Sequence, residues 1–405
     1  MPTRSTKRGA DRTPLAGDFD VIVCGASFAG LTVTRQLTGS GARVLLLDRY
    51  DIGERQTSAC GIPTGWLHAM GLEASARQEF GTLVVHTPHG TSRYDLPWSF
   101  STFDYRTLCE ILHDGCDAEF ETAKVEGRAT QREADDPAQG AKRPTHRPIT
   151  GSAGRLVTVR TDRGEVSAPL VVDALGWRRV LASAGYQPPD APLSRGLEVH
   201  PPGSGEDLEI WIDRRYVPAG YGWSFPAGSE TRIGVGSFDP GFHVKETTVL
   251  LAEDLEREPV RYQGNWIPHK LRRAAEGGVF FAGDSAGHCL PLTAEGIRTA
   301  FYFAIALGEE LRAVVERRKT RDAAIRDYAA FNDSHEWKFN WLLHAQRTVP
   351  RFPARAQRGL VAAAGSKRFV DWSFGHYLEI AHPRYAEQHA RRTTDARAPV
   401  AASFV

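Results

Sequence analysis

The residues best suited to chemistry near the start of the chain are two glycines and an acid around one turn. Residues 20–24 read as a short buried strand, and a helix is predicted over 31–37. The turn between them consists of Gly25, Ala26, Ser27, Phe28, Ala29 and Gly30. Gly25 permits a tight turn, Gly30 lets the helix pack against the strand, and Asp48 ends the next predicted strand, where it can accept ribose hydroxyls. Ser27 stands where this fingerprint has glycine, but it is small.

The turn predicts a binding site for the pyrophosphate of an adenine dinucleotide. Such a group needs backbone N–H donors and the positive end of a helix dipole, and a glycine turn that opens a helix supplies both. The alternative is a structural strand–helix–strand unit without a ligand.

A second strand–loop–helix unit lies far along the chain. Residues 278–284 read as a buried strand that ends in Gly283 and Asp284, and a helix is predicted from about residue 297 to 316. Its first turn can point N–H groups at a ligand, and Asp284 can accept hydrogen bonds from a ribitol-type hydroxyl chain. The nucleotide domain is therefore expected to be assembled from separated segments.

Four residues between these units are candidates for contact with the ligand. Arg49 and Arg55 could meet phosphate or ribose, and Cys60 lies in a small-residue patch where a flat ring can approach. The alternative for Cys60 is a small buried apolar residue. Arg106 follows a predicted N-cap, Asp104, where the helix dipole disfavours a cation, so a phosphate could hold it; an exposed surface arginine is the alternative.

Three aromatic residues alternate along a predicted strand. Tyr221, Trp223 and Phe225 would present their rings on one face, because strand side chains have a period of two. They form either a wall facing an apolar ligand or a flavin, or the ordinary core of a sheet.

Composition limits the classes of function. A chain of 405 residues is too long for one compact core and suggests two or three domains, and a formal net charge of +1 argues against nucleic acid as a partner. No apolar run is long enough to span a membrane, and no signal peptide is visible. Five scattered cysteines give neither a disulfide framework nor metal-ligand spacing, so a cytoplasmic location is expected.

Four stretches outside these motifs have a distinct composition. Residues 1–18 are polar and basic and are expected to form a disordered tail, and residues 129–154 an exposed, disordered loop between two strands. Around residues 333–353, aromatic and basic residues interleave in a predicted helix. This helix could touch a membrane surface or cap a lipid-sized cavity, but we favour a helix packed on the nucleotide domain with a solvated basic face. The residues from 390 onward are expected to be disordered.

Four stretches resemble the flavoprotein group of aromatic hydroxylases, flavin-dependent halogenases and geranylgeranyl reductases. GASFAG with Asp48 is similar to the group's ADP-binding fingerprint, and VVDALGWRR resembles its Asp-Gly motif through Asp173 and Gly176. FAGDSAGHCLPLTAEGIRTA resembles the Gly-Asp motif and flavin loop; the matching residues are Gly283, Asp284, Pro291, Gly296 and Ile297. YGWSFP is similar to the geranylgeranyl reductase pattern Tyr-x-Trp-x-Phe-Pro.

The resemblance implies an α/β protein that binds FAD. The implied fold is a Rossmann-like FAD-binding domain with an inserted, mainly antiparallel β-sheet substrate domain and a C-terminal helical segment. We assign residues 19–63, 105–185 and 275–320 to the FAD-binding domain, 64–104 and 186–274 to the substrate domain, and 321–405 to the helical segment.

Within this group the chain looks most like the reductases. The halogenase pattern Trp-x-Trp-x-Ile-Pro is not matched, and no lysine lies between Lys7 and Lys124 where halogenases need one. The resemblance implies an FAD-dependent oxidoreductase that reduces carbon–carbon double bonds of an isoprenoid or other apolar substrate. Cys60 would lie beside the flavin ring, and Tyr221 and Trp223 would line the substrate cavity. The electron donor would be transiently bound NAD(P)H or another reductant. A monooxygenase of a natural product, or a non-redox flavoprotein such as a cyclase, stays open as the alternative.

Overall fold

The structure is a computed structural model that describes residues 13–56, 58–129, 156–182 and 193–391. The tail before residue 13, the predicted loop over 130–154 and the end of the chain from 392 lie outside the described residues.

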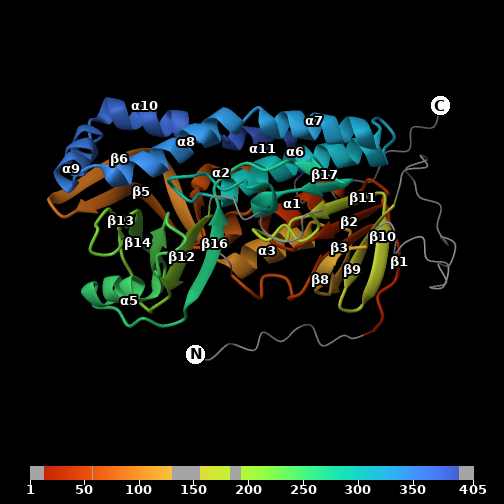
Figure 1. Cartoon of the computed structure of the whole chain (residues 1–405), viewed down its shortest axis with the longest axis horizontal. Helices are drawn as coiled ribbons and strands as arrows, with labels where there is room; N and C mark the ends of the chain where they lie inside the picture. The colour runs from red at the N-terminus through yellow and green to blue at the C-terminus, as the bar shows by residue number, and fades with distance from the viewer. Residues whose placement is uncertain (1–12, 57, 130–155, 183–192, 392–405) are drawn as a thin grey trace.

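A six-stranded sheet forms the centre of one half of the molecule (Figure 1). Its strands, in spatial order, are β17 (Ala275–Glu276), β18 (Val279–Phe281), β11 (Leu170–Asp173), β2 (Val21–Cys24), β3 (Val44–Asp48) and β7 (Glu119–Thr122). All pairs are parallel except β17 with β18. The strands come from three separated stretches of the chain, as expected for a domain assembled from distant segments.

Both faces of this sheet are covered, which explains its continuous apolar strands. On one face lie the helices α1 (Phe28–Leu37), α3 (Tyr105–Asp114) and α6 (Ile297–Val315), and on the other a smaller sheet. The smaller sheet has the order β1 (Gly17–Asp18), β10 (Gly164–Ala168), β9 (Val157–Thr161) and β8 (Val125–Arg128).

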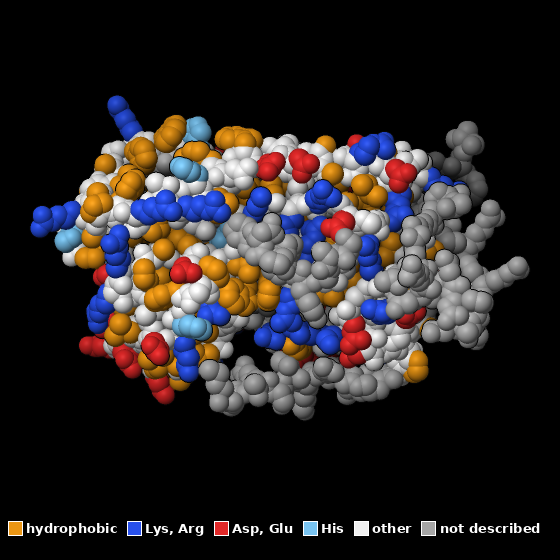
Figure 2. Space-filling model, viewed as in Figure 1, with side chains coloured by type: hydrophobic (Ala, Val, Ile, Leu, Met, Phe, Trp, Pro, Cys, Tyr) orange, Lys and Arg blue, Asp and Glu red, His pale blue; other side chains and the backbone are white. Residues whose placement is uncertain are grey.

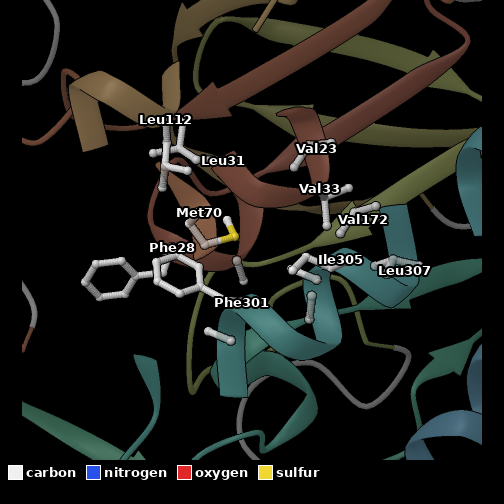
Figure 3. Close-up of a cluster of buried hydrophobic side chains, with 14 of the residues drawn as sticks. Val23, Phe28, Leu31, Val33, Met70, Leu112, Val172, Phe301, Ile305 and Leu307 are labelled. Carbon is white, nitrogen blue, oxygen red and sulfur yellow. The ribbon is translucent and has the colours of Figure 1, made fainter. Parts of the chain in front are cut away.

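Figure 3 shows the helical side of this core, where Phe28 at the start of α1 packs edge-to-face on Phe301 of α6, with 5.9 Å between ring centroids. Val23 and Val172 of the sheet lie against the same cluster. The first strand–helix unit and the later helix therefore share one core.

An eight-stranded, mainly antiparallel sheet forms the other half of the molecule. Its strands, in spatial order, are β16 (Gln263–Pro268), β12 (Leu193–Val199), β15 (Glu230–Ser237), β14 (Gly220–Ala227), β13 (Leu208–Trp211), β5 (Ala76–Thr87), β6 (Gly90–Phe103) and β4 (Gly61–Pro63). The hairpin β5–β6 turns at residues 88–89, where Pro and His precede Gly90. Helix α5 (Lys245–Asp254) packs on β12 and β15.

The C-terminal segment is a layer of helices along one side of both sheets (Figure 1). It consists of α7 (Arg321–Asp333), α8 (Glu336–Thr348), the short η4 (Val349–Arg351), α9 (Ala354–Ala363), α10 (Lys367–Leu378) and α11 (Pro383–His389). The Trp66 indole of α2 (Thr64–Met70) donates to the Ala381 carbonyl over 3.1 Å, and the Tyr94 hydroxyl of β6 to the Val361 carbonyl over 2.5 Å. The Arg298 guanidinium of α6 also donates to the Ala381 carbonyl over 3.1 Å, so the segment contacts both halves.

Two expectations differ from the structure. Helix α1 begins at Phe28, three residues before the predicted start, because the glycine turn itself is short. Residues 13–18 are not a disordered tail: β1 pairs in parallel with β10, and Leu15 is buried and bonded to the Arg163 carbonyl. The predicted N-cap of α3 is confirmed, since Asp104 accepts a hydrogen bond from the Thr107 N–H over 2.8 Å. Within the described residues, no helix combines the length and hydrophobicity that crossing a bilayer requires.

Candidate functional site

The glycine turn after β2 leaves no room for side chains. Gly25 has φ of +108°, and a Cβ there would lie 2.3 Å from the Ala174 carbonyl oxygen. A Cβ on Gly30 would lie 1.7 Å from the Gly25 carbonyl oxygen. Glycine is therefore required at both positions, as the dinucleotide fingerprint demands.

The start of α1 is arranged to meet an anion. Ser27 is the N-cap, but its side chain does not cap the helix and instead accepts from the Tyr105 hydroxyl over 3.1 Å. No acidic side chain occupies the first turn. The helix dipole and the N–H groups of residues 28–30 thus suit the pyrophosphate of FAD.

Asp48 is oriented by the backbone on either side of it. Its carboxylate accepts from the Ala26 N–H over 2.8 Å and the Tyr50 N–H over 3.0 Å. Burial raises the pKa of Asp48, and these donors together with Arg49 partly offset that effect. The acid therefore lies beside the glycine turn, where an adenosine ribose would bind.

The second unit packs directly against the first. A Cβ on Gly283 would lie 3.0 Å from the Ala29 side chain, so the glycine at this position lets the 3₁₀ turn η3 (Gly283–Ala286) approach the start of α1. Burial raises the pKa of Asp284 to about 6, and none of the described residues donates a hydrogen bond to its carboxylate. An acceptor that lacks donors suits the hydroxyl chain of a ribitol.

Asp173 and Gly176 bind the turn η3 through the Ser285 hydroxyl. Asp173 is fully buried, and its carboxylate accepts from the Leu175 N–H, the Leu181 N–H and the Ser285 hydroxyl at 3.0, 2.7 and 2.7 Å. The Ser285 hydroxyl also lies 2.9 Å from the Gly176 carbonyl. Asp173 thus fixes the turn that carries Asp284, and direct contact between Asp173 and the cofactor stays a prediction.

The glycine turn of residues 25–30, Asp48, η3 and the start of α6 together form what we call the dinucleotide cradle. The three candidate arginines lie outside it. Arg55 donates to the Tyr50 hydroxyl over 2.6 Å, and the guanidinium of Arg49 lies 4.7 Å from the centre of the same ring. Arg106 is exposed on the first turn of α3, and a Cβ on Gly53 would lie 2.7 Å from its Cα. Their contact with phosphate or ribose stays a prediction.

The loop between η3 and α6 is held by both other parts of the molecule. Leu292 and Ala294 adopt left-handed backbone conformations, with φ of +68° and +53°. The Tyr221 hydroxyl of the large sheet donates to the Thr293 carbonyl over 2.6 Å, and Gln346 of α8 accepts from the Leu292 N–H over 2.7 Å.

This loop contains the predicted flavin-loop residues. Pro291 lies within it, Gly296 is the N-cap of α6, and Ile297 is the first residue of that helix. The N-cap position makes no side-chain bond and the first turn holds no acid, so a second positive helix end faces the cradle.

Tyr377 of α10 completes the hold on this loop. Its hydroxyl bonds to the Glu295 carboxylate and lies 2.6 Å from the Thr293 hydroxyl. Glu295 in turn pairs with the fully buried Arg298 at 2.6 Å. The sequence did not indicate this group, because Tyr377 lies about 80 residues from Thr293 and Glu295 and no local pattern marks it.

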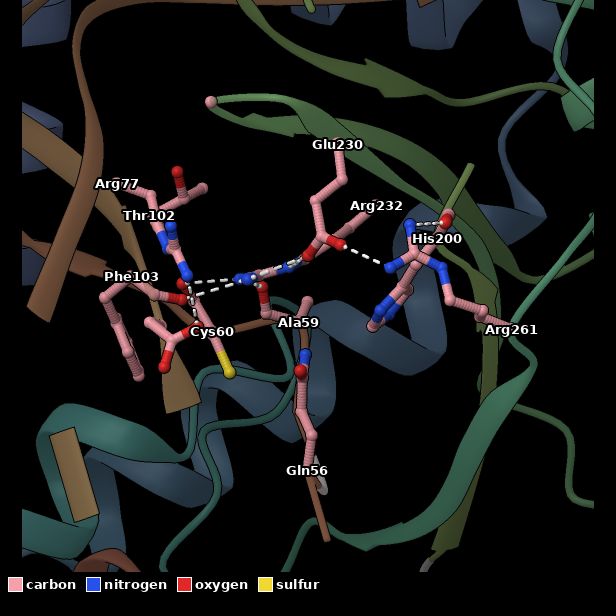
Figure 4. Close-up of polar contacts among 12 residues, drawn as sticks. Gln56, Ala59, Cys60, Arg77, Thr102, Phe103, His200, Glu230, Arg232 and Arg261 are labelled. Atoms are coloured by element: carbon pink, nitrogen blue, oxygen red, sulfur yellow. Dashed lines mark hydrogen bonds and ion pairs between the residues drawn. The ribbon is translucent and has the colours of Figure 1, made fainter. Parts of the chain in front are cut away.

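Cys60 is one of the residues whose polar contacts are drawn in Figure 4. It is fully buried, has φ of +54°, and its thiol donates to the Ser58 carbonyl over 3.2 Å. Burial raises the pKa of Cys60 well above the ordinary thiol value. The side chain is therefore a neutral thiol that retains its proton, and it is not a thiolate nucleophile.

Arg232 of β15 fixes the Cys60 loop and was missed from the sequence. Its guanidinium is buried and donates to the carbonyls of Ala59 and Phe103 at 2.8 and 3.0 Å, with Cys60 at 3.4 Å (Figure 4). Glu230 pairs with it at 3.3 Å. The available signal was a single arginine within the apolar, glycine-rich run TRIGVG, which is unusual for a buried strand.

Tyr221, Trp223 and Phe225 all lie on β14 and are half-buried, in keeping with a shared face. Trp223 lies over a floor of glycine: a Cβ on Gly234 would lie 2.2 Å from its ring. The Tyr221 and Trp223 centroids are 6.1 Å apart. The Trp223 ring thus lies against the sheet, and the Tyr221 ring, tilted by 60° to it, reaches the flavin loop through its hydroxyl.

A buried polar cluster connects this wall with the Cys60 loop. The Glu198 carboxylate accepts from the Trp223 indole, the His200 imidazole and the Gln263 amide at 3.3, 2.9 and 3.0 Å. The same amide donates to the Ser58 carbonyl over 3.1 Å. Cradle, thiol and wall are therefore joined by continuous contacts, and no group of metal-ligating side chains occurs in the described part of the chain.

Comparisons with known proteins agree with this geometry. No family model matches the chain. It is 23% identical over 353 residues to digeranylgeranylglycerophospholipid reductase 3 of Methanosphaera stadtmanae, covering 78% of this chain and 83% of that protein. It is 25% identical over 339 residues to digeranylgeranylglycerophospholipid reductase 2 of Methanopyrus kandleri, covering 77% and 81%.

Solved structures share the fold. A geranylgeranyl bacteriochlorophyll reductase-like protein from Thermoplasma acidophilum superimposes with a TM-score of 0.75 at 15% identity, covering 92% of this chain and 99% of that one. The anhydrotetracycline hydroxylase OxyS from Streptomyces rimosus reaches 0.61 at 19% identity, covering 88% and 75%. The expected resemblance and the expected fold are both confirmed.

Proposed function

We propose that this chain binds FAD and reduces carbon–carbon double bonds of an isoprenoid substrate. The observation that carries the proposal is the bond from Tyr221 to Thr293, because it joins the aromatic wall to the loop beside the dinucleotide cradle. A substrate lying on that wall would therefore meet the redox part of the cofactor. The sequence relatives with geranylgeranyl substrates in their names support an isoprenoid.

Reduced FAD would supply a hydride, and the chain would position the substrate, exclude water and provide a proton. The two glycines and the ends of α1 and α6 would hold the phosphates and the ring, and Asp284 the ribitol. The wall of Tyr221, Trp223 and Phe225 would exclude water from the double bond. The neutral Cys60 thiol, held by Ser58, would give its proton only to a carbon much more basic than a thiolate, such as the second carbon as hydride arrives at the first.

The electron donor belongs to the same proposal. The sequence holds one dinucleotide fingerprint, at residues 25–30, so NAD(P)H would bind transiently or another reductant would reduce the flavin. Peripheral membrane contact through the C-terminal segment also stays a proposal.

The test is anaerobic. The purified flavoprotein is reduced with dithionite, a geranylgeranyl lipid is added, and flavin reoxidation is followed in the visible band. We expect reoxidation together with a product that is two hydrogens heavier for each reduced bond by mass spectrometry. Reoxidation only after oxygen is admitted would favour a monooxygenase, and a protein without flavin would contradict the proposal.

Cys60→Ser tests the role of the thiol, with Cys116→Ser as the matched control. Cys116 is a thiol at the end of α3 that donates to the Leu112 carbonyl, away from the wall. We expect Cys60→Ser to slow reoxidation by about 10²-fold, the lower range for loss of a proton donor, and Cys116→Ser to leave it unchanged. Equal rates in both variants would remove Cys60 from the mechanism.

A further inference from the structure

Exposed aromatic side chains are concentrated in one stretch of the C-terminal segment. Of the eight large hydrophobic residues that are exposed in the described part of the chain, six lie between residues 337 and 372. They are Trp337, Trp341, Phe352, Leu360, Phe369 and Trp372. The exposed fractions of the three tryptophans are 68, 66 and 58%, which is far more than packing a helix on a domain would leave.

The buried side of α8 shows that this exposure is not loose packing. Phe339, Leu342 and Leu343 point into the molecule, while Trp337 and Trp341 lie one turn apart on the opposite side. The expectation of a helix packed on the body of the protein is correct for one face of α8. The tryptophan face stays largely exposed, and among the described residues only the neighbouring Lys338 ammonium lies over the Trp337 ring, at 6.0 Å from its centre.

Positive charge is concentrated in the same stretch. Residues 337–372 contain seven Lys and Arg residues and a single acid, Asp371, in a chain whose formal net charge is +1. Arg347, Arg351, Arg355, Lys367 and Arg368 are exposed. Figure 2 shows hydrophobic and basic side chains interspersed over the end of the molecule where α8, α9 and α10 lie in Figure 1.

We propose that this basic aromatic face, defined as the exposed side chains of residues 337–372, docks on an anionic lipid bilayer. Tryptophan is favoured at the membrane interface because its ring is apolar and its N–H is polar, and basic side chains attract acidic headgroups. A soluble acidic protein would match the charge but not three tryptophans exposed by more than half.

A cavity beside this face is lined by residues that neighbour the aromatic wall and the flavin loop. It has a volume of about 500 Å³ and is lined by Leu193, Phe238, Leu343, Gln346, Arg347 and Arg351, among others. Phe238 contacts the Tyr221 ring at 6.1 Å between centroids, and Gln346 holds the flavin loop. Resting on the function proposed above, the docked face would deliver a lipid to this cavity from the membrane.

The experiment is vesicle co-sedimentation of the flavin-loaded full chain. Vesicles of phosphatidylcholine alone are compared with vesicles containing equal parts phosphatidylcholine and phosphatidylglycerol. We expect binding to the anionic vesicles only. Trp337→Ser/Trp341→Ser/Trp372→Ser and, separately, Arg355→Glu/Arg368→Glu should each weaken binding at least tenfold. The matched control is Tyr262→Ser, which removes an exposed aromatic residue (49% exposed) outside the face.

Activity on a detergent-dispersed lipid separates this proposal from the proposed function. The tryptophan variant should retain that activity while losing vesicle binding. Wild-type protein that binds vesicles but reduces no lipid would contradict the function alone. Wild-type protein that stays in the supernatant would overturn docking, as would variants that bind equally well. A dimer that the tryptophan substitutions dissociate would show that a second copy covers the face, and would also overturn it.

Discussion

The dinucleotide cradle and the Cys60 loop differ in how they are built. The cradle is formed by backbone geometry. Gly25 and Gly30 lie within one turn, and the groups closest to their Cβ positions are backbone carbonyls. In the Cys60 loop, the backbone is held from outside by the guanidinium of Arg232, about 170 residues away in sequence. A backbone site leaves a contiguous pattern in the sequence, and a site held by distant side chains does not.

The largest effect should come from breaking the cradle. Gly30→Ala places a Cβ 1.7 Å from a backbone carbonyl that cannot move without breaking the turn. We expect a loss of more than about 5 kcal/mol in the free energy of unfolding, or no flavin in the purified protein. Gly359→Ala is the control, since nothing lies within 4 Å of its Cβ in α9. Absorbance at the flavin band measures flavin content, and thermal melting measures stability. A Gly30→Ala protein that binds flavin and is as stable as the wild type would contradict the predicted clash with the Gly25 carbonyl.

A smaller but selective effect is expected in the Cys60 loop. Arg232→Met leaves the buried carbonyls of Ala59 and Phe103 without their donor and should cost about 3–4 kcal/mol. Bound flavin should be retained while turnover falls, because the cradle is built separately. Arg261→Met removes a half-exposed partner of the same Glu230 and serves as the control. If Arg232→Met lost flavin but kept normal turnover per remaining flavin, the Cys60 loop and the cradle would not be built independently.

Asp284 belongs to the cradle, and its buried carboxylate is expected to make the stability of the flavin-free protein depend on pH. Because burial raises its pKa from 3.8 to about 6, the ionised form destabilises the flavin-free protein as pH rises through 6. Asp284→Asn should therefore stabilise flavin-free protein by up to about 3 kcal/mol at pH 7, with the gain vanishing near pH 4, and should weaken FAD binding. Urea unfolding between pH 4 and 7 measures it. A gain independent of pH would show that the carboxylate is not responsible.

The smallest effect should follow from removing the contact between Tyr377 of α10 and the flavin loop. Tyr377→Phe removes the hydroxyl that bonds Glu295 and Thr293 and should cost about 1–2 kcal/mol. Turnover should fall severalfold with FAD affinity nearly unchanged, because the loop lies at the ring end of the cradle. Tyr262→Phe, at an exposed position, is the control. A large drop in FAD affinity would mean that the C-terminal helices support the cradle itself.

The features that the structure places together as predicted are those with a local signature, and their contact with a cofactor stays a prediction. The turn at Gly25, the acid at Asp48, the pair Gly283–Asp284 and the alternating rings from Tyr221 to Phe225 could be identified because each depends on neighbours in the chain. The prediction of disorder is wrong for residues 13–18, for the converse reason. Its polar composition hides one buried leucine, Leu15, and one pairing with β10 that only the fold provides.

The sequence by itself determined the glycine turn after β2 and the type of fold, because glycine spacing and apolar periodicity encode backbone conformation locally. Only the tertiary structure decided that Arg232 holds the Cys60 loop, that Glu198 and Gln263 join this loop to Trp223, and that Tyr377 and Gln346 fix the flavin loop. Each of these contacts satisfies a buried polar group with a partner from a distant segment. Which partner is available is settled only when the sheets and the C-terminal helices pack together.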